Sequence, residues 1–335
     1  MSALQAEIIR DEAALAALEP AWRSLWRRCP AATPFQSPAW LRPWWAVFHP
    51  GALATVAVWD GPVLVALAPL YRENGPDGGR LLPVGISLSD FCDVLLDPAC
   101  PDAAGALGAA TARIGLPVQW VDLAPDAAGW SVATPPGWSN ESGPGESCPA
   151  LDLDRDRSTD DCGLPRSIPA TRRRKTRMAR HRAERRGPML FEDADALGPS
   201  AFLDALAQLH GARWRSRGEA GVLDDATVRE FHARALPLML AEGLAETALL
   251  RIGGAIAGAY YGFQDERRSY AYVGGFDPVF AHESPGAILL GRAIGRASGR
   301  GAASFSFLRG QEAYKYDWGA VDQPNSWRRV SPPHG

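Results

Sequence analysis

The hydrophobic residues near the N-terminus recur at steps of three and four, the period of a helix. The apolar positions of this stretch are Ala14, Leu15, Leu18, Trp22, Leu25 and Trp26. Cys29-Pro30 ends the pattern, because proline cannot continue a helix. A second helix is expected after Ser37-Pro38, which places a capping serine before a proline at the first helical position. The first fifty residues are therefore predicted to be helical.

Strand patterns begin after residue 51. The run ALATVAVWDGPVLVALAPLY has two apolar segments around Asp60-Gly61, a dipeptide typical of hairpin turns. Further strands are expected at residues 93–96 and 118–123, with a helix between them at residues 101–114. This alternation predicts an N-terminal α/β lobe over residues 1–160.

The middle of the chain changes composition. Residues 125–166 are rich in proline, glycine, serine and aspartate, apart from an apolar island at residues 150–153, and are predicted to form a loop and a strand that leave the first lobe. A basic helix is expected next, over residues 169–186, and Gly187-Pro188 ends it. It occupies a linker of residues 161–188.

The C-terminal half, residues 189–335, has the clearer pattern. Its predicted helices are residues 200–217, 224–242, 284–298 and 311–318, and its predicted strands are residues 246–252, 255–263, 268–274, 303–308 and 326–330. This order is typical of a mixed sheet flanked by helices. The fold class is therefore α/β (α+β), with two comparable lobes joined by the basic helix.

The composition is that of an ordinary globular protein, with 46% hydrophobic and 22% charged residues over 335 positions. About two domains are expected at this length. The longest apolar stretches have only strand length, and acids stand where a signal peptide needs a basic flank, so neither a transmembrane segment nor a leader is expected. Five cysteines without CxxC spacing favour a reduced, cytoplasmic protein over a disulfide framework or a zinc ribbon.

Positive charge is concentrated in residues 166–186. Ten basic residues and one acid give this segment a net charge of +9, so that the rest of the chain carries −12. Such a patch either binds an anionic partner (a nucleotide phosphate, RNA, an acidic glycan or a membrane surface) or forms a solvated helix face. The charge run alone leaves both interpretations open.

Two segments near the C-terminus contain candidate chemistry. The helix expected after Ser284 begins with free N–H groups and a positive dipole end, and Gly286 lets a phosphate approach the backbone; the alternative is an ordinary helix cap. Past the late strand, Glu312, Tyr314 and Lys315 combine a carboxylate, a phenol and an amine that can transfer protons; the alternative is a polar surface helix.

Other candidates are weaker. His210, Arg213 and Trp214 share one face of a predicted helix, where a lone histidine is either a base or a satisfied core residue. Asp90 and Asp93 flank an aromatic residue and are either loop caps or functional acids. The sequence contains no HxxxH or HExxH pair, no nucleophile elbow, no Walker P-loop and no Gly-x-Gly-x-x-Gly. Metal binding, serine hydrolysis, nucleotide hydrolysis and dinucleotide redox chemistry are therefore not expected.

Five segments occur in an order that is seen in a known family: FQSPAWLRPWW, SDFCD, LHGARW, GGFDPVFAHESPGAILL and FLRGQEAYKYDW. They resemble the Fem-like branch of the GNAT acyltransferases, which includes the CelD-like proteins associated with cellulose or exopolysaccharide synthesis. The resemblance runs from about residue 35 to residue 318 and is most specific over residues 284–318. It implies two GNAT-like lobes and acetyl-CoA or another acyl-CoA as cosubstrate, without a metal.

The resemblance also implies binding roles. Ser284 and Gly286 resemble the phosphate-contacting helix start, although the usual Arg/Gln-x-x-Gly-x-Gly/Ala motif is not matched and residues 282–286 occupy its place. His282 and Lys315 are further donor-binding candidates. The candidates for binding the acceptor are His210, Arg213, Trp214 and Arg309.

For catalysis, the resemblance implies that Tyr314 protonates the departing thiolate when an amine or hydroxyl attacks the thioester. Glu312 and Asp90 are the candidates for the base that takes the proton of the attacking group. One departure from the family lies at Ser306, where the usual strand reads Asp-Phe-Leu-Arg-Gly. An acid expected near the reacting centre is therefore missing.

Three functions fit these residues. The main prediction is acyl-CoA-dependent N- or O-acylation of a small-molecule or glycan acceptor, such as an amino sugar or an exopolysaccharide precursor, in the cytoplasm or at the periphery of the inner membrane. The second is an aminoacyl-tRNA-dependent Fem-type transfer, in which the basic helix holds tRNA phosphates. The third is a degenerate transferase that binds a glycan or nucleotide without turnover, with the substitution at Ser306 as its main support. DNA is not an expected partner.

Overall fold

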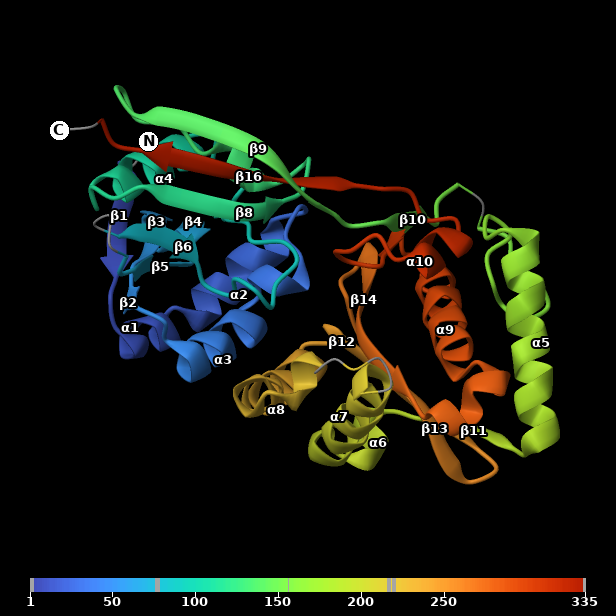
Figure 1. The fold of residues 1–335 in the computed structure, drawn as a ribbon. Coiled ribbons are helices and arrows are strands. Elements are labelled where there is room, and N and C mark those ends of the chain that lie inside the picture. Colours follow the sequence, from blue (N-terminus) through green and yellow to red (C-terminus); the bar gives the residue numbers. More distant parts are fainter. Residues whose placement is uncertain (1–2, 76–78, 156, 216–217, 219–220, 334–335) are drawn as a thin grey trace. The chain divides into compact units, whose positions relative to one another are not determined.

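The computed structural model describes residues 3–75, 79–155, 157–215, 218 and 221–333, with the side chains of residues 213–215 outside the description. The chain divides into two compact units. Unit 1 comprises Met1–Ser147 and Gln323–Gly335, and unit 2 comprises Cys148–Asp322 (Figure 1). Each unit is a mixed α/β structure, so the fold class expected from the sequence is confirmed.

Unit 1 contains two sheets and the helices that accompany them. The strand orders are β1-β3-β4-β7 and β2-β5-β6-β8-β16-β9. The core between these elements is aliphatic and includes Val56, Val58, Leu81 and Leu107. In chain order the elements are β1 (Gln5–Ile9), α1 (Glu12–Ala17), α2 (Glu19–Arg28), η1 (Pro34–Gln36), α3 (Pro38–Phe48), β2 (Ala52–Leu53), β3 (Thr55–Asp60), β4 (Val63–Ala68), β5 (Leu70–Glu73), β6 (Arg80–Pro83), β7 (Leu95–Leu96), α4 (Ala103–Ala112), β8 (Val118–Leu123), η2 (Ala128–Ser131), β9 (Ser139–Ser147) and β16 (Pro324–Ser331).

Two strands of unit 1 contradict the sequence-based prediction. β1 stands where only helix was expected, and it pairs antiparallel with β3. β9 stands where a loop was expected, because its sequence SNESGPGES has no hydrophobic alternation and most of its side chains are exposed. Its main chain pairs antiparallel with β16 along its length. Main-chain hydrogen bonds, which leave no hydrophobic signature, therefore hold this strand.

Strand β16 carries a buried arginine into unit 1. Arg328 is 4% exposed, and its Nε donates to Asn140 Oδ1 at 3.0 Å. One terminal nitrogen donates to the Gly129 carbonyl and the other to Thr134 Oγ1, the latter at 3.1 Å. The guanidinium carbon lies 5.6 Å from the centre of the Trp120 ring. All three nitrogens of this buried cation thus have acceptors, as buried polar groups require.

Unit 2 contains one six-stranded sheet in the order β10-β15-β14-β13-β12-β11. All neighbours are antiparallel except β14 and β15, which are parallel. In chain order the elements are β10 (Ala150–Asp152), α5 (Ala170–Arg186), β11 (Met189–Glu192), α6 (Ala194–Leu197), α7 (Pro199–Arg215), η3 (Val222–Asp224), α8 (Ala226–Ala241), β12 (Ala245–Ile252), β13 (Ala255–Gln264), β14 (Arg268–Phe276), η4 (Pro278–Glu283), α9 (Pro285–Gly299), β15 (Ser304–Ser306) and α10 (Ala313–Asp317).

The helices of unit 2 cover both faces of this sheet (Figure 1). Helix α9 packs on one face, where Leu289 lies against Gly258 of β13. Helix α7 packs on the other face, so close to β14 that its backbone at His210 touches Gly275. The basic segment is helical, as predicted, and it lies within unit 2. Its small buried residues Thr176, Ala179 and Ala183 face the unit, and α5 lies beside α9.

Candidate functional site

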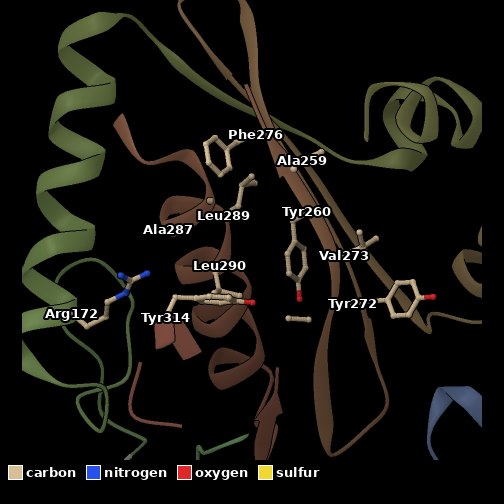
Figure 2. A pocket seen from close by; sticks show the side chains of 14 residues that line it. Arg172, Ala259, Tyr260, Tyr272, Val273, Phe276, Ala287, Leu289, Leu290 and Tyr314 are labelled. Atoms are coloured by element: carbon tan, nitrogen blue, oxygen red, sulfur yellow. The ribbon is translucent and has the colours of Figure 1, made fainter. Parts of the chain in front are cut away.

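A cavity of about 560 Å³ opens in unit 2 between the sheet and α9. Its walls are β13, β14 and the first turns of α9, and Arg172 of α5 and Tyr314 of α10 close one end (Figure 2). The lining is mostly backbone, glycine and apolar side chains. Only a few polar groups converge on it, which is typical of a pocket for a small molecule.

The cavity exists because the parallel strands β14 and β15 separate. They pair only from Arg268 to Tyr270, whereas β14 continues to Phe276. The register with β13 also shifts between Tyr261 and Gly262, so Tyr272 is an extra residue of a bulge. Beyond Tyr270, no strand among the described residues pairs with the edge of β14 that faces away from β13, and this edge borders the cavity. A strand edge that borders a cavity can pair with an extended ligand.

Helix α9 starts at the mouth of this opening. Ser284 precedes it in the left-handed conformation, with φ 53°, and Pro285 occupies the first helical position. The Ser284 carbonyl accepts from Ala287 at 3.0 Å, and the N–H of Gly286 has no acceptor inside the helix. A Cβ added at Gly286 would meet only Phe276, at 3.8 Å. Packing therefore does not require glycine here, and the space in front of Gly286 belongs to the cavity.

Tyr314 stands at the other end. Its side chain is 40% exposed and lies edge-on to Phe307, with ring centres 6.4 Å apart. Tyr260 of β13 lines the same cavity but is buried, and burial raises its pKa well above the usual range. The Tyr260 hydroxyl donates to the Tyr270 carbonyl at 3.4 Å. The third tyrosine of the lining, Tyr272, packs its ring centre 4.6 Å from that of Phe263. Between Tyr260 and Tyr314, the exposed Tyr314 is the phenol that a ligand can reach.

A buried lysine shapes the loop that carries Tyr314. Lys315 is 2% exposed, and its Nζ donates to the carbonyls of Leu308, Arg309 and Gly310 at 3.0, 2.7 and 2.9 Å. The Glu312 carboxylate lies 2.9 Å from the same nitrogen. These partners occupy the ammonium group, so Lys315 orients the start of α10. We therefore reassign it from donor binding to the positioning of Tyr314.

Ser306 has a local role. It is buried at the end of β15, and its Oγ accepts the N–H of Leu308 at 3.1 Å. Leu308 has a positive φ of 58°, and this hydrogen bond stabilises the turn there. The Ser306 side chain thus caps this turn.

Arg172 was not singled out by the sequence, yet it lines the cavity beside Tyr314 (Figure 2). Its guanidinium lies over the fully buried Trp318, 4.2 Å from the ring centre. Burial lowers its pKa from the ordinary arginine value. Nothing in the local sequence distinguishes Arg172 from the other nine basic residues of its segment. Tyr260 was missed for a similar reason, because a tyrosine in a buried strand resembles core.

The remaining predicted residues lie around this cavity or away from it. His210 is buried, with Nδ1 3.3 Å from the Gly274 carbonyl of β14. His282 is exposed, and its carbonyl accepts from Arg182 at 2.7 Å. Arg213 and Trp214 belong to α7, but their side chains lie outside the description.

Asp90 belongs to unit 1, whereas every residue that lines the cavity belongs to unit 2. It is 5% exposed, and its carbonyl accepts from Asn325 at 3.1 Å. Arg309 is partly buried in the loop before α10, where its carbonyl binds the lysine. Within the described ranges, no three His, Cys, Asp or Glu side chains gather as metal ligands would, and no helix has the length and apolarity to cross a membrane.

Comparison with known families bears on the nature of this site. Residues 170–316 match a family model described as an acetyltransferase (GNAT) domain. The matched range contains every residue that lines the cavity. The cavity therefore lies in the part of the chain that is similar to an acetyltransferase. No curated protein matches the chain.

Several solved structures share the fold of the chain at low sequence identity. FemX has a TM-score of 0.68 at 13% identity, over 97% of this chain and 96% of its own. The L-PGS from Bacillus licheniformis has a TM-score of 0.57 at 12% identity, over 94% and 92%. The C-terminal domain of a putative lysylphosphatidylglycerol synthetase from Agrobacterium fabrum has 0.55 at 13%, over 96% and 92%. These similarities concern the fold alone.

Proposed function

We propose that this protein transfers an acyl group from a coenzyme A thioester to an amine or hydroxyl of a small-molecule or glycan acceptor, such as an amino sugar or an exopolysaccharide precursor. The observation that carries the proposal is one continuous cavity, which joins the open start of α9 to the reachable phenol of Tyr314 along the edge of β14 that borders it. A coenzyme A thioester has the same order of parts: an anionic pyrophosphate, an extended amide-bearing arm and a thioester.

At the donor end, the start of α9 suits the pyrophosphate. The Gly286 N–H and the positive end of the helix dipole favour an anion, and the missing Cβ lets phosphate oxygens come close. Ser284 lies in the preceding turn and His282 in η4, so both remain candidates for phosphate contacts. The amide-bearing arm of coenzyme A then lies along the edge of β14 that borders the cavity.

At the reacting end, the acceptor nitrogen or oxygen attacks the thioester carbon. The new C–N or C–O bond forms, the C–S bond breaks, and the departing thiolate takes the proton of the Tyr314 hydroxyl. A phenol with an ordinary pKa of about 10 is a suitable acid for a thiolate whose conjugate acid has a pKa of about 8.5. Backbone N–H groups of β14 stabilise the developing oxyanion.

The proton of the attacking group leaves to a base. Glu312 is exposed two residues before Tyr314, on the same loop, and is our candidate. His210 touches the strand from the face opposite α9 and is proposed to contact the acceptor, together with Arg213, Trp214 and Arg309.

The test is a melting curve with coenzyme A. Binding confined to the folded state raises the free energy of unfolding by about 2.7 kcal/mol at a hundredfold excess over the dissociation constant. Gly286→Val should abolish this gain. Gly299→Val, at the open end of the same helix where an added Cβ meets nothing within 4 Å, should retain it. Equal behaviour of both variants would remove the donor site from α9.

A second candidate function is aminoacyl transfer from tRNA. It is favoured by the exposed face of α5, where Arg174, Lys175 and Arg185 lie in solvent. This function would be favoured over acyl-CoA-dependent transfer if charged tRNA, and not CoA, stabilised the folded protein. That stabilisation should be lost in Arg174→Glu and unchanged in Gly286→Val. The non-catalytic alternative rests on Ser306, which stands where the family has an acid and here accepts the N–H of Leu308; turnover of an acyl-CoA would exclude this alternative.

A further inference from the structure

Several arginines of α5 donate to protein acceptors, whereas Arg172 and Arg177 each have a buried Nε without a hydrogen-bond partner among the described residues, and of these two only Arg172 lines the cavity. Arg173 donates to the Ile168 carbonyl at 3.0 Å. Arg182 donates to the His282 carbonyl at 2.7 Å, and Arg186 donates to a carboxylate of η4 at 2.9 Å. These arginines attach the helix to its own unit. Arg172 has no comparable partner.

The guanidinium of Arg172 is largely buried and incompletely paired. Its side chain is 15% exposed, and its buried Nε has no hydrogen-bond partner among the described residues. The carboxylate of Asp317 lies 4.0 Å from Nη1, beyond hydrogen-bond distance, and 57% of that side chain is in solvent. An arginine stays charged even when burial lowers its pKa. The site therefore holds a cation with unused donors at the wall of a cavity.

The position of Arg172 indicates which part of the donor it faces. The end of α5 is attached to η4, immediately before α9, while Thr176 packs against Gly291 in the second turn of α9. The two helices are therefore antiparallel. At 1.5 Å per residue, the backbone of Arg172 lies about 13 Å beyond Gly286 along the helix axes. Arg172 is thus separated from the proposed pyrophosphate site and stands beside Tyr314, where the thioester would lie (Figure 2).

We propose that Arg172 binds a carboxylate carried by the transferred acyl group, so that the donor is the coenzyme A thioester of a dicarboxylic acid. This inference rests on the proposed function and names its donor class. A guanidinium presents a planar fork of donors that matches a carboxylate, and Trp318 holds that fork in place. An aminoacyl donor would instead bring a protonated amine toward a fixed positive charge. The same arginine therefore disfavours the tRNA-dependent alternative.

The experiment compares two thioesters of equal chain length. The acyl chain of succinyl-CoA ends in a carboxylate, whereas that of butyryl-CoA ends in a methyl group. CoA itself measures the binding of the cofactor without an acyl group. By calorimetry we expect the unaltered protein to bind succinyl-CoA at least about tenfold more tightly than butyryl-CoA, the contribution of a charge-assisted hydrogen bond. Arg172→Gln should abolish the preference, and Arg172→Lys should retain part of it. Arg174→Gln, the same charge change on the exposed face, should leave it intact.

Two results would overturn the proposed dicarboxylic donor without contradicting the proposed acyl-CoA-dependent transfer. One is equal affinity of the unaltered protein for the two thioesters. The other is a loss of affinity in Arg172→Gln that is as large for CoA as for succinyl-CoA, because the guanidinium would then bind a phosphate of the cofactor. If the folded protein binds neither CoA nor either of the two thioesters, the proposed function fails, and the inference about Arg172 fails with it. Circular dichroism melting of each variant separates lost binding from lost folding.

Discussion

Each unit contains an arginine that lies over a tryptophan ring, and the two arginines have opposite surroundings. Arg328 of unit 1 lies over Trp120 and has an acceptor for each of its three nitrogens. Arg172 of unit 2 lies closer to its ring, Trp318, but the carboxylate of Asp317 is 4.0 Å from its Nη1. Burial lowers the pKa of both. All three nitrogens of Arg328 donate to protein acceptors, whereas the Nε of Arg172 has no acceptor among the described residues. Arg172 therefore has a donor that a ligand can accept.

The spaces beside these arginines differ in the same way. In unit 1 the space beside α4 is filled: it is lined by Trp120 and Trp138 and leaves a cavity of about 10 Å³. A Cβ added at Gly108 of α4 would lie 2.3 Å from the Ala133 carbonyl oxygen. In unit 2 the corresponding space between β14 and α9 measures about 560 Å³. The space beside the helix is thus filled in unit 1 and forms a cavity in unit 2, and the candidate acid Tyr314 lines that cavity.

The comparison predicts unequal stability costs for one matched substitution. Arg328→Gln should lower the free energy of unfolding by roughly 3 kcal/mol, because it leaves buried acceptors unpaired. Arg172→Gln should cost about 1 kcal/mol, the contribution of its contact with the ring. Urea unfolding of both variants measures the difference. Equal costs would mean that Arg172 is as structural as Arg328.

The second prediction concerns the open unit alone. Tyr314→Phe should lower turnover by roughly 10²-fold or more, because it removes the proton for the departing thiolate. The dissociation constant for CoA should stay nearly unchanged. Tyr316→Phe is the matched control: its hydroxyl, on the same short helix, donates to Asp322 at 2.7 Å. If both variants turn over at the normal rate, Tyr314 is a packing residue.

The third prediction concerns the mouth of the cavity. Gly286→Val should remove the ligand-induced gain of about 2.7 kcal/mol at a hundredfold excess of CoA, while the unfolding of the free protein changes little. An added side chain meets only Phe276 at 3.8 Å, so the fold tolerates it. Calorimetric titration of the variant measures the effect. Normal CoA affinity would place the pyrophosphate elsewhere.

The fourth and smallest effect concerns the packed unit. Asp93 accepts the N–H groups of Val94, Ala128 and Gly129, and burial raises its pKa to about 6. A raised pKa means that the folded state favours the protonated form. Its contribution is therefore complete below about pH 4 and is lost as the pH rises through about 6. Urea midpoints between pH 4 and 7 should show this slope, and Asp93→Asn should flatten it. An unchanged slope in the variant would assign the pH dependence to other groups.

The sequence alone determined the order of elements in the C-terminal half. The strands that became β12, β13 and β14 and the helices that became α8 and α9 were predicted within a few residues, because buried faces impose a hydrophobic period. The candidate anion site at Gly286 and the candidate acid Tyr314 were also found there, since glycine after a proline at a helix start and a tyrosine after a late strand are local signals.

Only the tertiary structure decided which distant residues meet. β9 exists as a strand because β16, almost two hundred residues later, supplies hydrogen bonds to its main chain, and main-chain pairing leaves no pattern in the side chains. Lys315 changed from a ligand candidate to a positioning residue because carbonyls of its own loop surround it. Arg172 emerged from a run of similar cations because burial and the absence of a close partner depend on three-dimensional packing. Local sequence records the period of an element and its ends, whereas satisfaction of buried charge is a property of the folded surroundings.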